Sequence, residues 1–397
     1  MEIDIGEWGL SRRAERLWLD GQDLTGLAER FGTPVHVVSA GRLRARTAEV
    51  LDAFSHYPGR AHIHFSYKTN TVAGVLRVLH DAGLGAEVVN GYELHLARRL
   101  GVPGERIVFN GPNKTDAELR AAIDAGVGLL VVDHLEELTR VQSLAQQSEQ
   151  RVRIGLRVCP DISPRHMNAS SLTGSRRNQF GLDLPANEYN IALGRVAGSD
   201  ELELRGVMAH IGSGIHDLKS FERTVQTLLD LHVAAFDAGC SPDVIDIGGG
   251  LGAQLSRELT TFELLAYLGV GRLPKLGRPG SSDLWARYAE VVCGALVDGC
   301  EPDEGVDDPR RPGRRQADLA GEARPHAAQQ DVERDDDRHE SRYADTEAVL
   351  ADVDEYLLDV HAAQYAAAAE EQQEVVVHRR KHVRGLQIRI AFGPFFH

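Results

Sequence analysis

The feature that most constrains the fold is a repeated alternation between short apolar runs and segments with helical spacing. The apolar runs predict strands at 62–67, 86–89, 106–109, 128–132, 153–158, 204–210 and 244–247, and the segments between them predict helices that include 73–82, 91–100, 115–125, 134–147 and 219–238. Strands that alternate with helices along a chain indicate a parallel sheet. Seven such units with short connections favour a closed (β/α)8 barrel over an open sheet.

Both ends of the chain depart from this alternation. Residues 1–30 predict a short amphipathic segment, and Phe31-Gly32-Thr33-Pro34 predicts a turn that leads into an apolar strand at 35–38. The eighth strand of a barrel is expected near 303–310, but this segment is rich in acidic residues and makes a poor core strand. The sequence therefore predicts a barrel with a defect at its last strand.

The segment 301–345 has a different composition from the rest of the chain. About half of its residues are charged, and its only large aliphatic residues are Val306, Leu319 and Val332. Such a segment buries too little apolar surface to offset its ordering entropy, so we expect disorder there and helical spacing again over 346–374. The predicted parts are an N-terminal segment at 1–30, a barrel at 31–300, a charged segment at 301–345 and a degenerate C-terminal region at 346–397.

Composition and charge exclude several classes of protein. The formal net charge of -15 argues against nucleic acid or an anionic membrane as the main partner. No apolar run approaches the ~20 residues that span a bilayer, and Met1-Glu2-Ile3-Asp4 lacks the basic, apolar character of a signal segment. We therefore expect a cytoplasmic, acidic protein. No close metal-binding spacing joins the four cysteines, which are Cys159, Cys240, Cys293 and Cys300.

Lys68 is the first candidate for chemistry. It follows the first predicted strand and precedes a helix, at the barrel edge where reacting groups collect. The chain has only five lysines, and a lysine can lose its proton and attack a carbonyl, which an arginine cannot do. The alternative is a surface lysine beside a helix N-terminus.

Two further candidates follow the sixth and seventh predicted strands. His210 ends the sixth strand and is followed by Ser213, and three consecutive glycines end the seventh strand as Asp246-Ile247-Gly248-Gly249-Gly250. Glycines allow backbone N–H groups to approach a phosphate closely. A dinucleotide fingerprint with Glu263 as its ribose acid is the competing interpretation, but barrel enzymes commonly bind phosphate after strand seven, which fits better.

These motifs resemble a known family. Phe65-Ser66-Tyr67-Lys68-Thr69-Asn70 resembles the lysine motif of the fold-type III pyridoxal-phosphate enzymes, most closely the diaminopimelate and ornithine decarboxylases, and the resemblance extends from about residue 31 to residue 252. It implies an alanine-racemase-type (β/α)8 barrel followed by a β-domain. It also implies pyridoxal 5'-phosphate as cofactor, an amino acid as substrate, and a homodimer.

The resemblance also implies roles for individual residues. Lys68 would hold the cofactor as a Schiff base, and His210 would stack on the cofactor ring. Ser213 would bind the phosphate with a set of residues that the resemblance places around it, namely Gly248, Gly249, Gly250 and Arg314. Glu87 and Arg157 match an acidic and a basic position near the cofactor, and Glu93 is either a second acidic site residue or a solvated helix-start acid.

Several positions differ from the family. Gln179 stands where the decarboxylases have lysine, and Arg311 precedes Pro312-Gly313-Arg314 where they have a glutamate that protonates the ring nitrogen, with Glu301 as a second candidate for that acid. The Cys-Glu-Ser and Gly-Ala-Tyr motifs that the family supplies across its dimer are missing, which suggests a frame-shifted or degenerate C-terminus. We expect a diaminopimelate decarboxylase-like enzyme with impaired activity. The alternatives are an ornithine- or lysine-type decarboxylase, an amino-acid racemase, and a non-catalytic relative that binds the cofactor.

Overall fold

A computed structural model describes residues 9–165, 167, 172–176, 178–252, 261–272, 283–299 and 386–392. The chain divides into two units, one formed by residues 1–300 and 382–397 and the other by residues 301–381. All described residues belong to the first unit. The predictions for 301–345 and 346–374 concern residues outside the described ranges.

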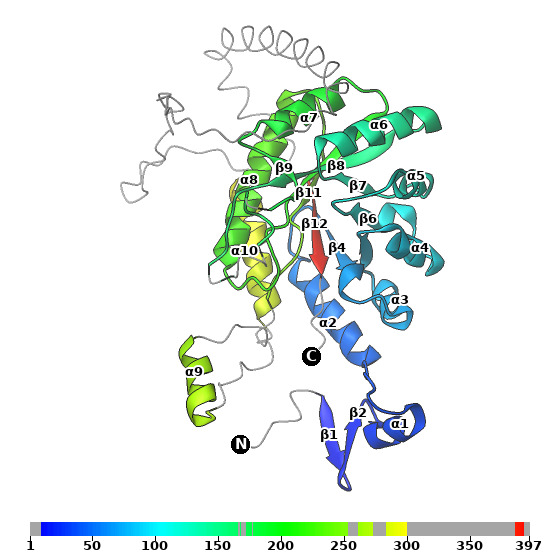
Figure 1. Cartoon of the computed structure of the whole chain (residues 1–397), viewed down its shortest axis with the longest axis vertical. Helices are drawn as coiled ribbons and strands as arrows, with labels where there is room; N and C mark the ends of the chain where they lie inside the picture. The colour runs from blue at the N-terminus through cyan, green and yellow to red at the C-terminus, as the bar shows by residue number, and fades with distance from the viewer. Residues whose placement is uncertain are drawn as a thin grey trace, which may run out of the picture. The chain divides into compact units, whose positions relative to one another are not determined.

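The first unit contains a closed barrel of eight parallel strands (Figure 1). Around the barrel these are β4 (Arg60–Ser66), β5 (Gly85–Val88), β6 (Ile107–Asn110), β7 (Leu129–Val132), β8 (Val152–Cys159), β10 (Leu202–Met208), β11 (Val244–Asp246) and β12 (Gln387–Phe392). The ring closes because β10 pairs with both β8 and β11, while β12 pairs with both β11 and β4. The predicted (β/α)8 barrel is confirmed, and a two-residue strand β9 (Leu182–Asp183) extends β8.

Helices alternate with the strands, and those near 73–82, 91–100, 115–125, 134–147 and 219–238 confirm the prediction. The helices are α2 (Ala40–Ala53), α3 (Ala73–Asp81), α4 (Gly91–Arg99), α5 (Asp116–Asp124), α6 (Leu135–Ser148), α7 (Glu188–Ala197), α8 (Leu218–Asp237), α9 (Thr261–Val270) and α10 (Leu284–Asp298). Local capping fixes several helix starts. The clearest is a capping box at α5, where Thr115 and Glu118 satisfy each other's backbone N–H groups.

The two faces of the barrel strands have separate cores. Outward residues such as Ile63 and Phe65 belong to the large core that includes the helices. A second buried cluster consists of Val108, Leu129, Val131 and Met208, which alternate with the outward residues and so fill the barrel interior.

Strand β12 corrects the prediction for the eighth strand. The position between β11 and β4 is taken by Gln387–Phe392, not by a segment near 303–310, which lies outside the described residues. Ile388 and Ile390 are buried, and Gln387 bonds both to His62 (2.9 Å) and to Asp243 (2.8 Å). Part of the region predicted as degenerate therefore completes the barrel.

The N-terminal segment also differs from the prediction. A three-stranded antiparallel sheet comprises β1 (Leu10–Arg13), β2 (Arg16–Leu19) and β3 (Gln22–Asp23), and helix α1 (Leu24–Phe31) follows it. The strand predicted at 35–38 is wrong. That segment pairs with no strand among the described residues, and Val35, Val37 and Val38 are about 40% exposed. An apolar run without a neighbouring strand does not form a sheet.

No helix within the described ranges is long and apolar enough to cross a membrane, and no group of three or more metal-ligand side chains gathers in them.

Candidate active site

Lys68 lies at the C-terminal edge of the barrel, in a single 3₁₀ turn (Tyr67–Thr69) between β4 and α3. The Thr69 hydroxyl donates to the Ser66 carbonyl (2.6 Å), which fixes the turn. Tyr67 is fully buried beneath it, and its hydroxyl bonds to His80 Nε2 (2.7 Å). Because the neighbours of Lys68 are anchored in this way, the exposed lysine side chain projects from a rigid support.

His210 follows β10 on the same edge of the barrel. Its Nδ1 accepts a hydrogen bond from the Gly249 backbone N–H (3.2 Å), so the neutral ring carries its proton on Nε2. Burial, and then the positive charges of Lys68 and Arg157, lower the pKa of His210 well below its ordinary value. The charges of Lys68 and Arg157 therefore act on the His210 ring, which stays neutral.

The glycine loop after β11 contacts the segment that contains His210. Gly248 (φ 62°) and Gly250 (φ 99°) have left-handed backbone conformations that favour glycine. A Cβ atom on Gly250 would overlap the Gly212 carbonyl oxygen. The Gly250 carbonyl accepts from the Ile215 N–H (2.8 Å), which joins this loop to the turn that carries the exposed Ser213.

Two of the three glycine N–H groups already have protein partners. The Gly248 N–H donates to Asp246 Oδ1 (2.9 Å), and the Gly249 N–H donates to His210. The sequence analysis assigned all three glycines to a phosphate. In the structure, the N–H groups of Gly248 and Gly249 shape the loop and orient the His210 ring, and the phosphate role of the glycines stays a prediction.

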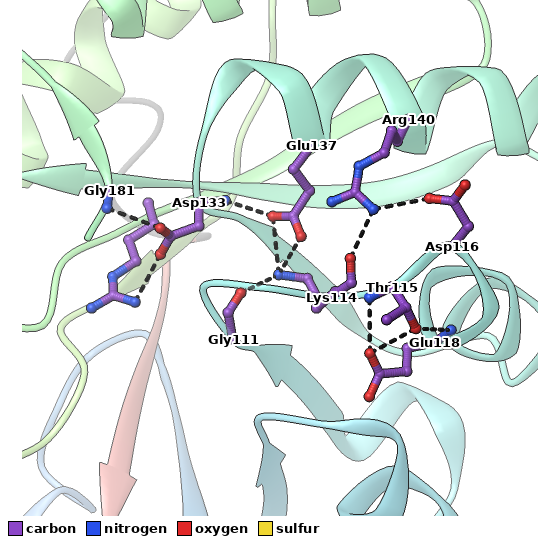
Figure 2. Close-up of polar contacts among 10 residues, drawn as sticks. Gly111, Lys114, Thr115, Asp116, Glu118, Asp133, Glu137, Arg140 and Gly181 are labelled. Atoms are coloured by element: carbon purple, nitrogen blue, oxygen red, sulfur yellow. Dashed lines mark hydrogen bonds and ion pairs between the residues drawn. The ribbon is translucent and has the colours of Figure 1, made fainter. Parts of the chain in front are cut away.

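Arg157 is held by an ion pair that the sequence analysis missed. Its Nη1 lies 2.8 Å from Asp133 Oδ1, and both side chains are buried. The guanidinium also lies over the Phe180 ring, 4.7 Å from its centroid. The second oxygen of Asp133 accepts from the Gly181 N–H (3.2 Å), so the segment with the Gln179-for-lysine difference is tied to this pair (Figure 2).

A second buried ion pair adjoins the first. Lys114 Nζ lies 2.9 Å from Glu137 Oε1 and donates to the Gly111 carbonyl. Glu137 also accepts from the Asp133 backbone N–H (2.8 Å), as Figure 2 shows. Burial lowers the pKa of Lys114, while Glu137 opposes that shift. Lys114 was not among the residues predicted from the sequence, although its rarity as one of five lysines was a usable signal.

Acidic residues lie deeper in the barrel. Glu87 is buried and accepts from Asn110 Nδ2 (2.9 Å). Burial, and then the charge of Glu87, raise the pKa of Asp246 to about 7. Glu93 accepts the Val89 N–H (2.9 Å) while its own N–H donates to Asn90, so it caps the start of α4. Glu93 therefore lies at a helix start but is not solvated, because its side chain is buried and burial raises its pKa.

Some predicted residues cannot be placed. Arg314, Arg311 and Glu301 lie outside the described residues. Next to the glycine loop, β12 presents Ala391, whose N–H donates to the Gly248 carbonyl (2.8 Å). The side chain of Ala391 is a methyl group, so Ala391 cannot give a proton to the ring nitrogen of a cofactor.

Comparisons with known proteins agree with this geometry. The diaminopimelate decarboxylases of Aquifex aeolicus and Methanocaldococcus jannaschii are each 33% identical to this chain over 251 residues. The alignments cover 63% and 61% of this chain but 58% and 56% of the relatives, so the chain spans less than two thirds of their length.

Solved structures give the same result. The crystal structure of diaminopimelate decarboxylase from M. jannaschii has a TM-score of 0.63 at 25% identity and covers 74% of this chain and 64% of that one. A structure of the enzyme in complex with L-lysine has a TM-score of 0.62 at 26% identity and covers 73% and 62%. The family model for the pyridoxal-dependent decarboxylase, pyridoxal binding domain, matches residues 40–270, more than half of the chain. The chain therefore belongs to the pyridoxal-dependent decarboxylase family.

Proposed function

We propose that this chain is the pyridoxal-phosphate-binding barrel of an amino-acid decarboxylase and that it acts on meso-diaminopimelate to give lysine and carbon dioxide. The observation that carries the proposal is the convergence of Lys68, His210 and the glycine loop at one edge of the barrel. In a (β/α)8 barrel, catalytic groups collect at this edge.

The residues present fit pyridoxal phosphate. Lys68 offers an exposed primary amine for the cofactor aldehyde, and His210 offers a neutral ring on which the pyridine can stack. The phosphate would lie beside Ser213, whose side chain is exposed on the turn that the Ile215–Gly250 backbone hydrogen bond holds against the glycine loop. Bound there, the cofactor supplies an electron sink for the electrons released when the α-carboxylate leaves.

The protein's own groups prepare the pocket electrostatically. The Gly249 N–H orients the His210 ring, and the charges of Lys68 and Arg157 disfavour a second proton on it. Glu87, held by Asn110, would offer a carboxylate to the cofactor ring.

The substrate assignment comes from the relatives. The curated relatives described above are diaminopimelate decarboxylases, and the M. jannaschii enzyme has been solved with L-lysine bound, the compound that this decarboxylation would release. Participation in lysine biosynthesis, a cytoplasmic location and a homodimer belong to the same proposal. Light scattering of the purified chain would test the dimer directly.

Product analysis tests the function. The purified chain with pyridoxal phosphate is incubated with diaminopimelate, ornithine, lysine and arginine in parallel, beside the Lys68→Ala variant. Carbon dioxide release from diaminopimelate that Lys68→Ala abolishes supports the proposal. Loss of optical rotation without carbon dioxide would identify a racemase, and no change in any amino acid would leave a cofactor-binding protein.

A further inference from the structure

We propose that Glu137, which forms a buried ion pair with Lys114, is a positioning residue of the cofactor pocket and that it acts on Arg157 through Asp133. The proposal rests on the proposed function in one respect, namely that the pocket beside Arg157 binds the cofactor. The four side chains come from three successive strand–helix units and form one connected set, drawn in Figure 2.

The first step is the burial of the pair. Lys114 and Glu137 have no exposed side-chain surface, and Nζ is satisfied by Glu137 (2.9 Å), the Gly111 carbonyl (2.5 Å) and the face of Phe109 (5.7 Å). Removing two charges from water costs several kcal/mol per ion, and the attraction between the two ions often offsets this cost only in part. A pair of leucines would fill such a site without that cost, so stability alone does not explain the pair.

The second step is the link from Glu137 to Asp133. Glu137 Oε2 accepts from Lys114 Nζ (3.0 Å) and from the Asp133 backbone N–H (2.8 Å). One carboxylate oxygen therefore fixes both the lysine and the backbone of the residue that ends the β7 unit. Lys114 in turn fixes the rotamer of Glu137.

The third step is the link from Asp133 to Arg157. The Asp133 carboxylate uses one oxygen for Arg157 Nη1 (2.8 Å) and the other for the Gly181 N–H (3.2 Å). Phe180 then closes over the guanidinium. Asp133, the partner of Arg157, is itself anchored, and Phe180 covers the guanidinium. The Arg157 charge is therefore held in one place, from which it acts on His210.

Two matched double variants test this chain of contacts. Lys114→Met with Glu137→Gln removes both charges but keeps an oxygen that can accept the Asp133 N–H. Lys114→Met with Glu137→Leu removes that acceptor as well. Both replace a buried pair by uncharged residues, a change that proteins often tolerate. If the leucine variant does not fold, Glu137→Met replaces Glu137→Leu.

The readout is the His210 pKa in the protein without cofactor, measured by NMR on histidine-labelled samples and assigned with a His210→Gln variant. Arg157→Met sets the reference, because removing this positive charge should raise the His210 pKa. We expect the Glu137→Leu double variant to raise that pKa in the same way, and the Glu137→Gln double variant to leave it at the wild-type value.

The outcomes separate the possibilities. Equal His210 pKa values in the two double variants, with lower stability in the second, would show that the pair is merely structural and would overturn the proposal. The cofactor is absent from this measurement. A pKa shift would therefore support the positioning role even if Lys68→Ala showed that the decarboxylase assignment is wrong.

Discussion

Two arcs of the barrel differ in how well their buried cations are hydrogen-bonded. The first arc runs from β4 to β8, and each of its strands is followed along the chain by the next one around the ring. Its buried cation Lys114 is fully paired. The closing arc, β10 to β12, ends with a strand from far along the chain. Its buried cation Arg389 has two guanidinium nitrogens, Nε and Nη1, with no hydrogen-bond partner among the described residues.

This difference indicates which arc is specialised for the site. The first arc combines Lys68 with two adjoining buried ion pairs, in which Lys114 and Arg157 each have an acidic partner. In the closing arc, burial lowers the pKa of Arg389, and Asp246 opposes that shift only through its charge. A buried cation without hydrogen bonds stabilises the fold less than a paired one, so we expect Arg389 to contribute less to stability than Lys114.

The largest expected contrast is between the two buried cations. Lys114→Met leaves the Glu137 carboxylate buried without its cation and should lower the free energy of unfolding by on the order of 5 kcal/mol. Arg389→Met removes a poorly satisfied charge and should cost less than about 1 kcal/mol. Urea denaturation of both variants measures the difference. Equal losses of unfolding free energy in the two variants would contradict the difference between the two buried cations.

The pH dependence of stability tests the closing arc next. Asp246 has a pKa raised to about 7 in the folded protein, and the groups around it are Glu87, Arg389 and Arg157. The folded state therefore keeps a proton that the unfolded state loses above its ordinary pKa of about 4. Stability should fall as the pH rises through this window, by about 4 kcal/mol in total, and then level off above 7.

Asp246→Asn is the control for that dependence, because the amide cannot ionise. Denaturation midpoints across the same pH series should be flatter for the variant than for the wild type. A wild-type stability that rises with pH over this window would contradict the assignment.

Two cavity-forming variants test whether β12 contributes as much to the stability of the core as β8 does. Ile388 in β12 and Ile154 in β8 are both fully buried. Ile388→Ala and Ile154→Ala should each cost about 3 kcal/mol, since each leaves a similar cavity. A cost near zero for Ile388→Ala alone would show that β12 does not complete the barrel in solution.

The smallest effect concerns helix starts. Thr115→Ala breaks the capping box of α5 in the first arc and should cost about 1 kcal/mol. Asp283, at the start of α10, makes no side-chain cap bond, so Asp283→Ala should have little effect. Thermal denaturation resolves the two. A larger loss for Asp283→Ala would reverse the expected order.

The sequence predicted the regular part of the fold because that part is local. Each strand and helix predicted between 62 and 247 has its own apolar period and lies within a few residues of its predicted bounds, whereas β9 and α7 were not predicted. The strand predicted at 35–38 failed because periodicity does not reveal whether a neighbouring strand exists. β12 was missed because its partners, β4 and β11, are far away in the sequence.

The site was predictable to the same extent. Lys68, His210 and the glycine loop are visible as motifs at strand ends. The ion pairs were not, because Lys114 pairs across 23 residues with Glu137 and Arg157 across 24 with Asp133. Which of many charges meet depends on how adjacent strand–helix units align, and that alignment is not encoded in any single motif.

The central claim is that Lys68 holds the cofactor, and covalent trapping tests it most directly. The chain is mixed with pyridoxal phosphate, reduced with borohydride and digested, and the labelled peptide is identified by mass spectrometry. With only five lysines in the chain, every alternative can be counted. We predict that the label lies on Lys68 and disappears in Lys68→Ala, while Lys219→Ala, at an exposed lysine in α8, retains it. A label spread over the other lysines, or one that persists in Lys68→Ala, would contradict the account.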